Sequence, residues 1–180
     1  MLSERLILVD PEDNKIGEYE KIRAHQYGML HRAFSVVLFR ERNNTTETLL
    51  QQRSIKKYHG GGLWTNTCCS HPHVGEDLTQ AAHVRLKEEM GIETELQEVG
   101  KFHYIAKLDH GMTENEIDHV FIGNYEVDNI LFNSEEVDDF LWMDIDVLQN
   151  DLLKHPEKFT PWFTEALNIA SNAYPGLKPR

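Results

Sequence analysis

The chain has 180 residues, of which 40% are hydrophobic and 27% are charged. This is the composition of an ordinary globular protein that is long enough to bury a full core. Its formal net charge of −12 argues against a nucleic-acid-binding protein, which needs a basic surface to neutralise phosphates.

Signals for secretion and for membrane insertion are missing from the sequence pattern. No run approaches the roughly 18 apolar residues that span a bilayer, and no basic segment followed by an apolar one resembles a signal peptide. We therefore expect a cytoplasmic protein without membrane contact. Because Cys68 and Cys69 are adjacent, we expect reduced thiols rather than a disulfide framework. We also expect a single domain over residues 1–180 and a monomer, since no apolar helix face stands out.

The first half of the chain predicts short strands separated by polar turns. The strands are expected at residues 6–9, 16–22, 34–39 and 49–53. The polar stretch 40–47 predicts a hairpin between the last two strands rather than a domain linker. A loop containing Gly28 is expected between His25 and His31.

The second half adds helices. Apolar residues at positions 78, 82, 86 and 90 predict an amphipathic helix over residues 76–90, and Gly91 is suited to end it. Strands at 101–106, 114–127 and 140–143 and a helix at 147–154 follow. Thr160 and Pro161 predict the start of a last helix, with the threonine as its N-cap. Helices interspersed among strands and hairpins indicate an α/β sandwich with a mixed sheet.

Candidate metal ligands come from separate segments, each next to a predicted strand. Period-2 alternation places Glu114, Glu116 and Asp118 on one face of the strand 114–127, an arrangement that suits a cation better than a core. Neutral imidazoles with carboxylates suit Mn²⁺, Mg²⁺ or Zn²⁺. The candidate ligands are His25, His31, His71, Glu114 and Glu116. The alternative is a set of scattered surface histidines, since the chain has ten.

The segment 64–73 contains both cysteines and follows a triple glycine. A thiol beside imidazoles could act as a base or a nucleophile, although a cytosolic cysteine is more commonly a small buried hydrophobe. Four basic side chains could hold phosphate oxygens, or could be ordinary solvated charges: Lys21, Arg53, Lys57 and Arg85. For Arg85, an intrahelical salt bridge with Glu88 or Glu89 is a further alternative.

Three features together resemble the type I isopentenyl-diphosphate isomerases, a family with the Nudix fold. They are the string Thr65-Asn66-Thr67-Cys68-Cys69-Ser70-His71-Pro72, the helix that ends at Gly91, and Glu114-Asn115-Glu116. The resemblance covers the chain from about Leu6 to Trp162. It implies an α/β fold of the Nudix type, an α/β/α sandwich with a mixed β-sheet.

The helix itself resembles a degenerate Nudix box, G-x5-E-x7-R-E-U-x-E-E-x-G-U. Ser70 stands at the first glycine, and Val84-Arg85 stands at the Arg-Glu pair. The other acidic and glycine positions match at Glu76, Glu88, Glu89 and Gly91. A Nudix hydrolase uses the Arg-Glu pair to orient and charge its Mg²⁺ site, so this departure disfavours a hydrolase and fits the isomerases.

The resemblance also implies roles for residues. Cys69 would be the catalytic thiol and Glu116 the second catalytic group, assisted by Tyr104. One divalent metal, Mn²⁺ or Zn²⁺, would be bound by His25, His31, His71, Glu114 and Glu116. A Mg²⁺ ion bridging the diphosphate would use Glu89 and the main chain of Cys69. The diphosphate would be held by Lys21, Arg53, Lys57 and Arg85, with Trp162 facing the hydrocarbon.

The implied reaction is a metal-dependent 1,3-allylic proton shift that converts isopentenyl diphosphate to dimethylallyl diphosphate. Cys69 and Glu116 would act as acid and base, in an order that the sequence leaves open. Two other classes stay open as well: a Nudix hydrolase of a nucleoside diphosphate derivative, and a non-catalytic diphosphate-binding module. Such a module has no use for Cys69 and Glu116 together.

Overall fold

The computed structural model describes residues 4–177. Its strands form one sheet: β1 (Arg5–Val9), β2 (Lys15–Glu20), β3 (His31–Arg42), β4 (Thr45–Arg53), β5 (Trp64–Thr65), β6 (Cys68–Ser70), β7 (Gln97–Lys107), β8 (Thr113–Asn124) and β9 (Val137–Asp144). Its α-helices are α1 (Lys21–Gln26), α2 (Leu78–Met90), α3 (Ile145–Lys154) and α4 (Phe163–Ala173). Short 3₁₀ turns lie at Asp109–Gly111, Pro156–Lys158 and Pro175–Leu177.

The long strand β3 is the centre of the sheet. It pairs in parallel with β8 and antiparallel with β4 and β6. β7 then extends the sheet beside β8, β9 and β5 extend it beside β4, and the β1–β2 hairpin joins β3 through Leu8 and His31. Parallel and antiparallel pairs therefore coexist, which confirms the predicted mixed sheet.

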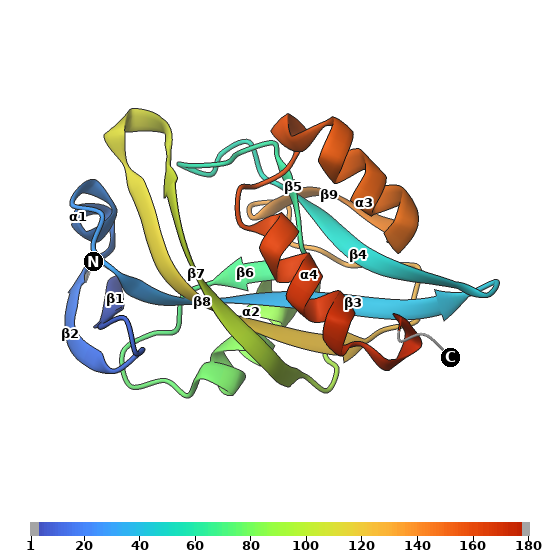
Figure 1. The fold of residues 1–180 in the computed structure, drawn as a ribbon, viewed down its shortest axis with the longest axis horizontal. Coiled ribbons are helices and arrows are strands. Elements are labelled where there is room, and N and C mark those ends of the chain that lie inside the picture. The colour runs from blue at the N-terminus through green and yellow to red at the C-terminus, as the bar shows by residue number, and fades with distance from the viewer. Residues whose placement is uncertain (1–3, 178–180) are drawn as a thin grey trace.

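Alternation along β3 explains the three layers. Phe34, Val36 and Leu38 pack with α2 on one face of the sheet, whereas Val37 and Phe39 pack with α3 and α4 on the other. All five are at most 1% exposed. Burying a side chain of this size contributes roughly 1.5–3 kcal/mol, so both faces of β3 stabilise the sandwich. Figure 1 shows α4 crossing the sheet on the near side.

The turns and the ends of α2 follow local rules. The β3–β4 hairpin turns at Asn43 and Asn44, whose φ angles of 52° and 61° suit a tight hairpin turn. The Asp77 side chain caps α2 by accepting from the Gln80 amide, and Gly91 ends it in the left-handed conformation. The helix and the hairpin were both predicted from the sequence.

Other local predictions were wrong. The strand predicted over residues 16–22 ends at Glu20 and is followed by α1, because the Glu20 carboxylate accepts from the amides of Ile22 and Arg23 and so caps a short helix. The predicted loop with Gly28 is present at residues 27–30. The last helix begins at Phe163 without a side-chain cap. The Thr160 hydroxyl is used elsewhere, in a 2.7 Å hydrogen bond with the hydroxyl of Thr65.

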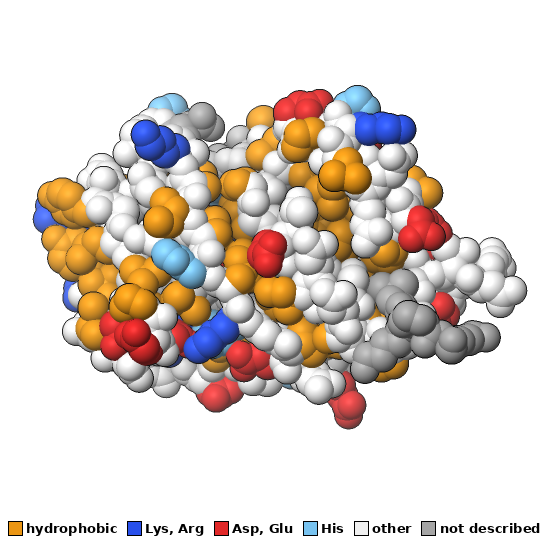
Figure 2. All heavy atoms as spheres, viewed as in Figure 1, with side chains coloured by type: hydrophobic (Ala, Val, Ile, Leu, Met, Phe, Trp, Pro, Cys, Tyr) orange, Lys and Arg blue, Asp and Glu red, His pale blue; other side chains and the backbone are white. Residues whose placement is uncertain are grey.

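The surface has mixed charge on the side shown in Figure 2, where Lys and Arg side chains are scattered among acidic and hydrophobic ones. Within residues 4–177, no helix is both long enough and apolar enough to cross a membrane.

Candidate active site and metal centre

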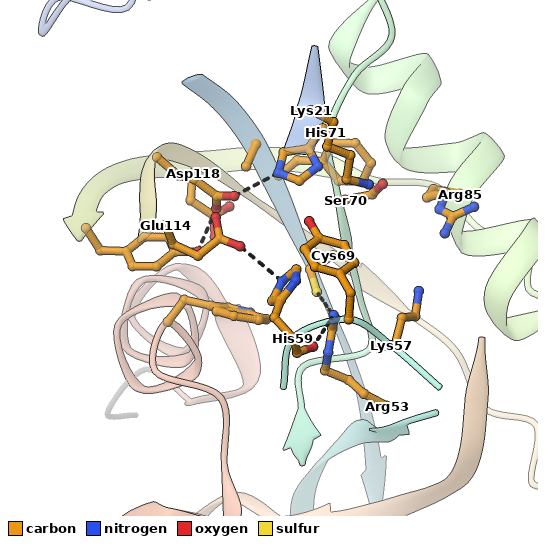
Figure 3. A pocket seen from close by; sticks show the side chains of 16 residues that line it. Lys21, Arg53, Lys57, His59, Cys69, Ser70, His71, Arg85, Glu114 and Asp118 are labelled. Carbon is orange, nitrogen blue, oxygen red and sulfur yellow. Dashed lines mark hydrogen bonds and ion pairs between the residues drawn. The ribbon is translucent and has the colours of Figure 1, made fainter. Parts of the chain in front are cut away.

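One pocket collects most of the predicted site residues. It lies where β6 and β8 flank β3, and it is closed by the segment between β4 and β5 and by the residues before α4 (Figure 3). The predicted residues that line it are Lys21, Arg53, Lys57, Cys69, His71, Arg85, Tyr104, Glu114, Glu116 and Trp162. Segments that are far apart in sequence thus meet at one pocket.

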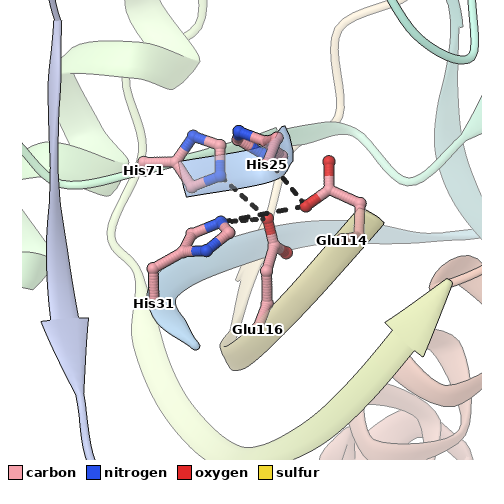
Figure 4. Close-up of side chains that lie close together, drawn as sticks. All are labelled: His25, His31, His71, Glu114 and Glu116. Carbon is pink, nitrogen blue, oxygen red and sulfur yellow. Dashed lines mark hydrogen bonds and ion pairs between the residues drawn. The ribbon is translucent and has the colours of Figure 1, made fainter. Parts of the chain in front are cut away.

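Five side chains form a compact group at the inner end of this pocket: His25, His31, His71, Glu114 and Glu116 (Figure 4). Each offers one ligand atom, and these atoms all lie within 4.8 Å of one another. The parallel pairing of β3 with β8 places His31 directly beside Glu116, and the alternation along β8 turns Glu114 to the same side. Four of the five are at most 5% exposed and His71 is only slightly more accessible.

Hydrogen bonds on the outer side of the group orient the imidazoles. Nδ1 of His25 donates to the Lys21 carbonyl at 2.7 Å, and Nδ1 of His31 donates to the Met29 carbonyl at 2.8 Å. In a neutral imidazole, Nε2 is then a lone-pair donor facing the carboxylates. Nε2 of His25 lies 3.2 Å from Oε2 of Glu114, and neither atom has a hydrogen-bond partner. A proton or a cation must lie between two such buried acceptors, so these residues fit a divalent metal ion.

Glu116 is held on both carboxylate oxygens. Oε1 lies 2.8 Å from Nε2 of His71 and 3.2 Å from Nε2 of His31, and Oε2 accepts a 2.7 Å bond from the Tyr104 hydroxyl. Burial opposes ionisation of Glu116, but the two imidazoles hold its pKa well below the usual range. Burial lowers the pKa of His71 to about 4 and raises the pKa of Tyr104 well above its usual value. At neutral pH, Glu116 is ionised and Tyr104 is a neutral donor.

The two cysteines have different environments. Cys69 lines the pocket, with Nη1 of Arg53 3.5 Å from its sulfur. Desolvation raises the pKa of the Cys69 thiol to about 12. Cys68 is 0% exposed and packs among the core residues beneath α2. The alternation along β6 therefore sends one thiol into the pocket and the other into the core.

The predicted phosphate-binding side chains also contact carboxylates. Nη2 of Arg85 lies 2.8 Å from Glu89 and 3.2 Å from Oε2 of Glu136, and Lys57 forms an ion pair with the same oxygen of Glu136. Lys21 pairs with Glu4 at 3.0 Å. An anion therefore already lies between Lys57 and Arg85. Glu136 lies 79 residues from Lys57 along the chain, so no local sequence pattern indicates this contact.

The predicted second metal site is not assembled in the same way. Glu89 is 3% exposed, and its oxygens accept from Gln51 at 2.9 Å and from Arg85 at 2.8 Å. Neither Glu89 nor Cys69 belongs to the five-residue group. A cation at Glu89 requires one of these donors to move.

Trp162 forms part of the apolar wall of the pocket. It is 4% exposed, and its Nε1 donates to Oδ1 of Asn66 at 3.2 Å. Its ring lies 6.1 Å from that of Tyr104 and 5.5 Å from the Arg53 guanidinium carbon. This wall can face a hydrocarbon.

Sequence reasoning missed two functional candidates in the pocket. Asp118 was placed on the correct face of its strand but was given no role. It accepts a 2.8 Å bond from Ser35, and burial raises its pKa well above the usual range. The other candidate is His59, and the triple glycine that follows it in the sequence is the signal that points to it.

Comparison with known proteins identifies a matching family model and similar curated proteins. A family model described as NUDIX domain matches residues 29–163. The chain is 46% identical to "Isopentenyl-diphosphate Delta-isomerase" of Serratia proteamaculans, with 90% of this chain and 88% of that protein covered. It is 47% identical to the protein of the same name from Photobacterium profundum, with 96% and 97% covered.

Among solved structures, DR0079 from Deinococcus radiodurans has a TM-score of 0.74 at 16% identity, covering 92% of this chain and 98% of that one. A MutT protein from Methanosarcina mazei has a TM-score of 0.61 at 18% identity, covering 77% and 91%. At these identities the likeness concerns the fold alone.

Proposed function

We infer the function of this chain from its family, because it belongs to the NUDIX domain proteins and, among them, to the isopentenyl-diphosphate Delta-isomerases. The reaction is the conversion of isopentenyl diphosphate to dimethylallyl diphosphate. One proton is added to the terminal alkene carbon, and another is removed from the carbon next to the diphosphate-bearing one. The diphosphate itself is unchanged.

The observation that carries the proposed mechanism is that Cys69 and Glu116 line the same pocket from strands on opposite edges of β3. Protonation of an unactivated alkene forms a tertiary carbocation, which requires a site that excludes water. A donor on one side and an acceptor on the other complete the shift without moving the substrate. We assign these two roles to Cys69 and Glu116. Tyr104 holds Oε2 of Glu116, the oxygen that faces away from the five-residue group.

The five-residue group, from here on called the metal group, adjoins the proposed proton-transfer site because it shares Glu116 with it. When bound by the three imidazoles and two carboxylates, a divalent cation such as Mn²⁺ or Zn²⁺ fixes Glu116 and tunes its acidity. The support for this assignment is the pair of buried acceptors, Nε2 of His25 and Oε2 of Glu114, that lack any other partner.

The diphosphate is proposed to bind at the basic mouth of the pocket. Lys21, Lys57 and Arg85 are shared between the pocket and the adjoining surface depression, so an anion can reach them from solvent. Arg53 lies deeper, beside Cys69. We propose that Glu89 would help to hold a Mg²⁺ ion that neutralises charge on the diphosphate, and that Arg85 would then contact the phosphates instead of Glu89.

Trp162 is proposed to stabilise the carbocation. Its ring lines the pocket, and a desolvated cation over an indole face gains about 2 kcal/mol or more. The hydrocarbon end of the substrate would then lie between Trp162 and the proton-transfer groups.

The proposal is tested by incubating the purified chain with isopentenyl diphosphate, Mg²⁺ and Mn²⁺ in D₂O and following the mixture by proton and phosphorus NMR. Deuterium in the product methyl groups, with the diphosphate intact, is the expected result. Release of inorganic phosphate would identify a Nudix hydrolase instead. Unchanged substrate would leave only a binding function.

A further inference from the structure

His59 is a buried histidine of the pocket that the proposed mechanism does not use. It lies in the segment between β4 and β5, is 7% exposed, and places Nε2 3.0 Å from Oε1 of Glu114 (Figure 3). His59 lies outside the five-residue group, and it faces Oε1 of Glu114, whereas His25 faces the other oxygen, Oε2. Its Nε2 is therefore placed to donate a hydrogen to Oε1 rather than to bind the metal.

The two carboxylates of the metal group are held in the same manner. Glu116 turns Oε1 to the imidazoles, and its Oε2 is held by the hydroxyl of Tyr104 at 2.7 Å. Glu114 turns Oε2 to His25, and its Oε1 is held by His59. In each case one oxygen faces the proposed metal and a neutral donor fixes the other.

The backbone around His59 is built to hold this position. A Cβ atom on Gly61 would lie 2.9 Å from the Ile55 carbonyl oxygen, which is too close for any other residue, and Gly60 and Gly62 have φ angles of +60° and +80°. The His59 carbonyl also accepts from Nη2 of Arg53 at 3.3 Å. The triple glycine thus folds this segment tightly against β4 and directs the imidazole into the pocket.

We propose that His59 is a positioning residue of the metal site. By donating from Nε2 to Oε1 of Glu114, it keeps Oε2 turned toward His25 and so preforms the ligand geometry. This inference rests on the proposed function in one respect, that the five residues bind a divalent metal.

The test measures Mn²⁺ binding to the metal-stripped full chain, with free Mn²⁺ quantified by electron paramagnetic resonance. His59→Phe keeps an aromatic ring of similar size but has no donor, and it should weaken Mn²⁺ binding by about 10–100-fold, the usual effect of losing such an outer partner. His59→Gln places an amide donor near the original Nε2 position, and its dissociation constant should stay within about threefold of the wild-type value. His155→Phe, at an exposed histidine that caps the end of α3, is the matched control and should leave binding unchanged.

A second pair keeps the test decisive if the phenylalanine variant does not fold. His59→Asn has an amide that is too short to reach Glu114, so it should bind Mn²⁺ more weakly than His59→Gln. Equal Mn²⁺ affinity for all folded His59 variants and the wild type would overturn the positioning role while leaving the metal site and the isomerase proposal intact. If the wild type itself bound no Mn²⁺, the inference would fail together with the metal assignment, and the D₂O assay would still report separately on the reaction.

Discussion

The adjacent cysteines offer a matched pair of substitutions. Cys69→Ala removes one of the two proposed proton-transfer groups, so kcat should fall by about 10²–10⁴-fold, a rise in activation free energy of about 3–5 kcal/mol. The Cys69 thiol is only partly buried, and its loss should change the unfolding temperature little.

Cys68→Ala should behave in the opposite way. The Cys68 side chain is 0% exposed beneath α2, and removing its sulfur resembles the loss of one buried methyl group, about 1 kcal/mol. For a chain of this length, that lowers the unfolding temperature by roughly 2–4 °C. Its kcat should stay within about threefold of the wild-type value, since the proton-transfer groups are untouched.

Both variants are assayed for turnover of isopentenyl diphosphate and for thermal unfolding by circular dichroism. Loss of turnover in Cys68→Ala with turnover retained in Cys69→Ala would refute the assignment of faces along β6. Similar losses of turnover in both variants would show that the thiols maintain the structure of the site and do not transfer protons.

Three further predictions follow from the site and the fold. Trp162→Leu should lower kcat by about 30-fold, the rate equivalent of about 2 kcal/mol of cation–π stabilisation; an unchanged kcat would remove Trp162 from the chemistry. Glu136→Gln should lower the KM for isopentenyl diphosphate by about fivefold, because a partly exposed ion pair worth about 1 kcal/mol no longer competes for Lys57 and Arg85. A higher KM would mean that Glu136 positions these cations instead. The Asp13 side chain is 8% exposed, and this burial opposes its ionisation, but hydrogen bonds and ion pairs with Arg32, Lys101 and His119 lower its pKa from 3.8. Its ionised form therefore stabilises the fold above the unfolded-state pKa, and that stability is lost as the pH falls through the lower folded-state value. Asp13→Asn should reduce the stability at neutral pH and flatten its dependence on pH below about 4, measured by urea unfolding over a pH series.

The sequence predicted those elements whose signals are local and repeated. The helix α2 has an i, i+4 apolar pattern and a glycine stop, and β8 has a long alternation that places Glu114 and Glu116 on one face. By contrast, β5 and β6 are two and three residues long. β5 is a strand because it pairs with β4, and β6 because it pairs with β3. Segments this short show no periodic pattern in the sequence.

The same distinction applies within the site. The five-residue metal group was expected from residue types and from the family resemblance, and its assembly depends on the parallel pairing of β3 with β8. His59 and Glu136 were missed because their roles depend on contacts with distant residues. Glu114 is 55 positions from His59, and Arg85 and Lys57 are 51 and 79 positions from Glu136. Contacts over such separations leave no pattern in a sequence.

Arg53 connects the separate parts of the proposed mechanism. One guanidinium nitrogen lies 3.5 Å from the sulfur of Cys69, and the other donates to the carbonyl of His59, whose ring holds Glu114. The guanidinium carbon also lies 5.5 Å from the Trp162 ring. A diphosphate that binds Arg53 therefore contacts a side chain that is already hydrogen-bonded to the Cys69 thiol and to the carbonyl of His59. Binding energy from the unreactive end of the substrate can thus restrain the groups that we propose to move protons at the other end, which is where an enzyme gains rate from binding.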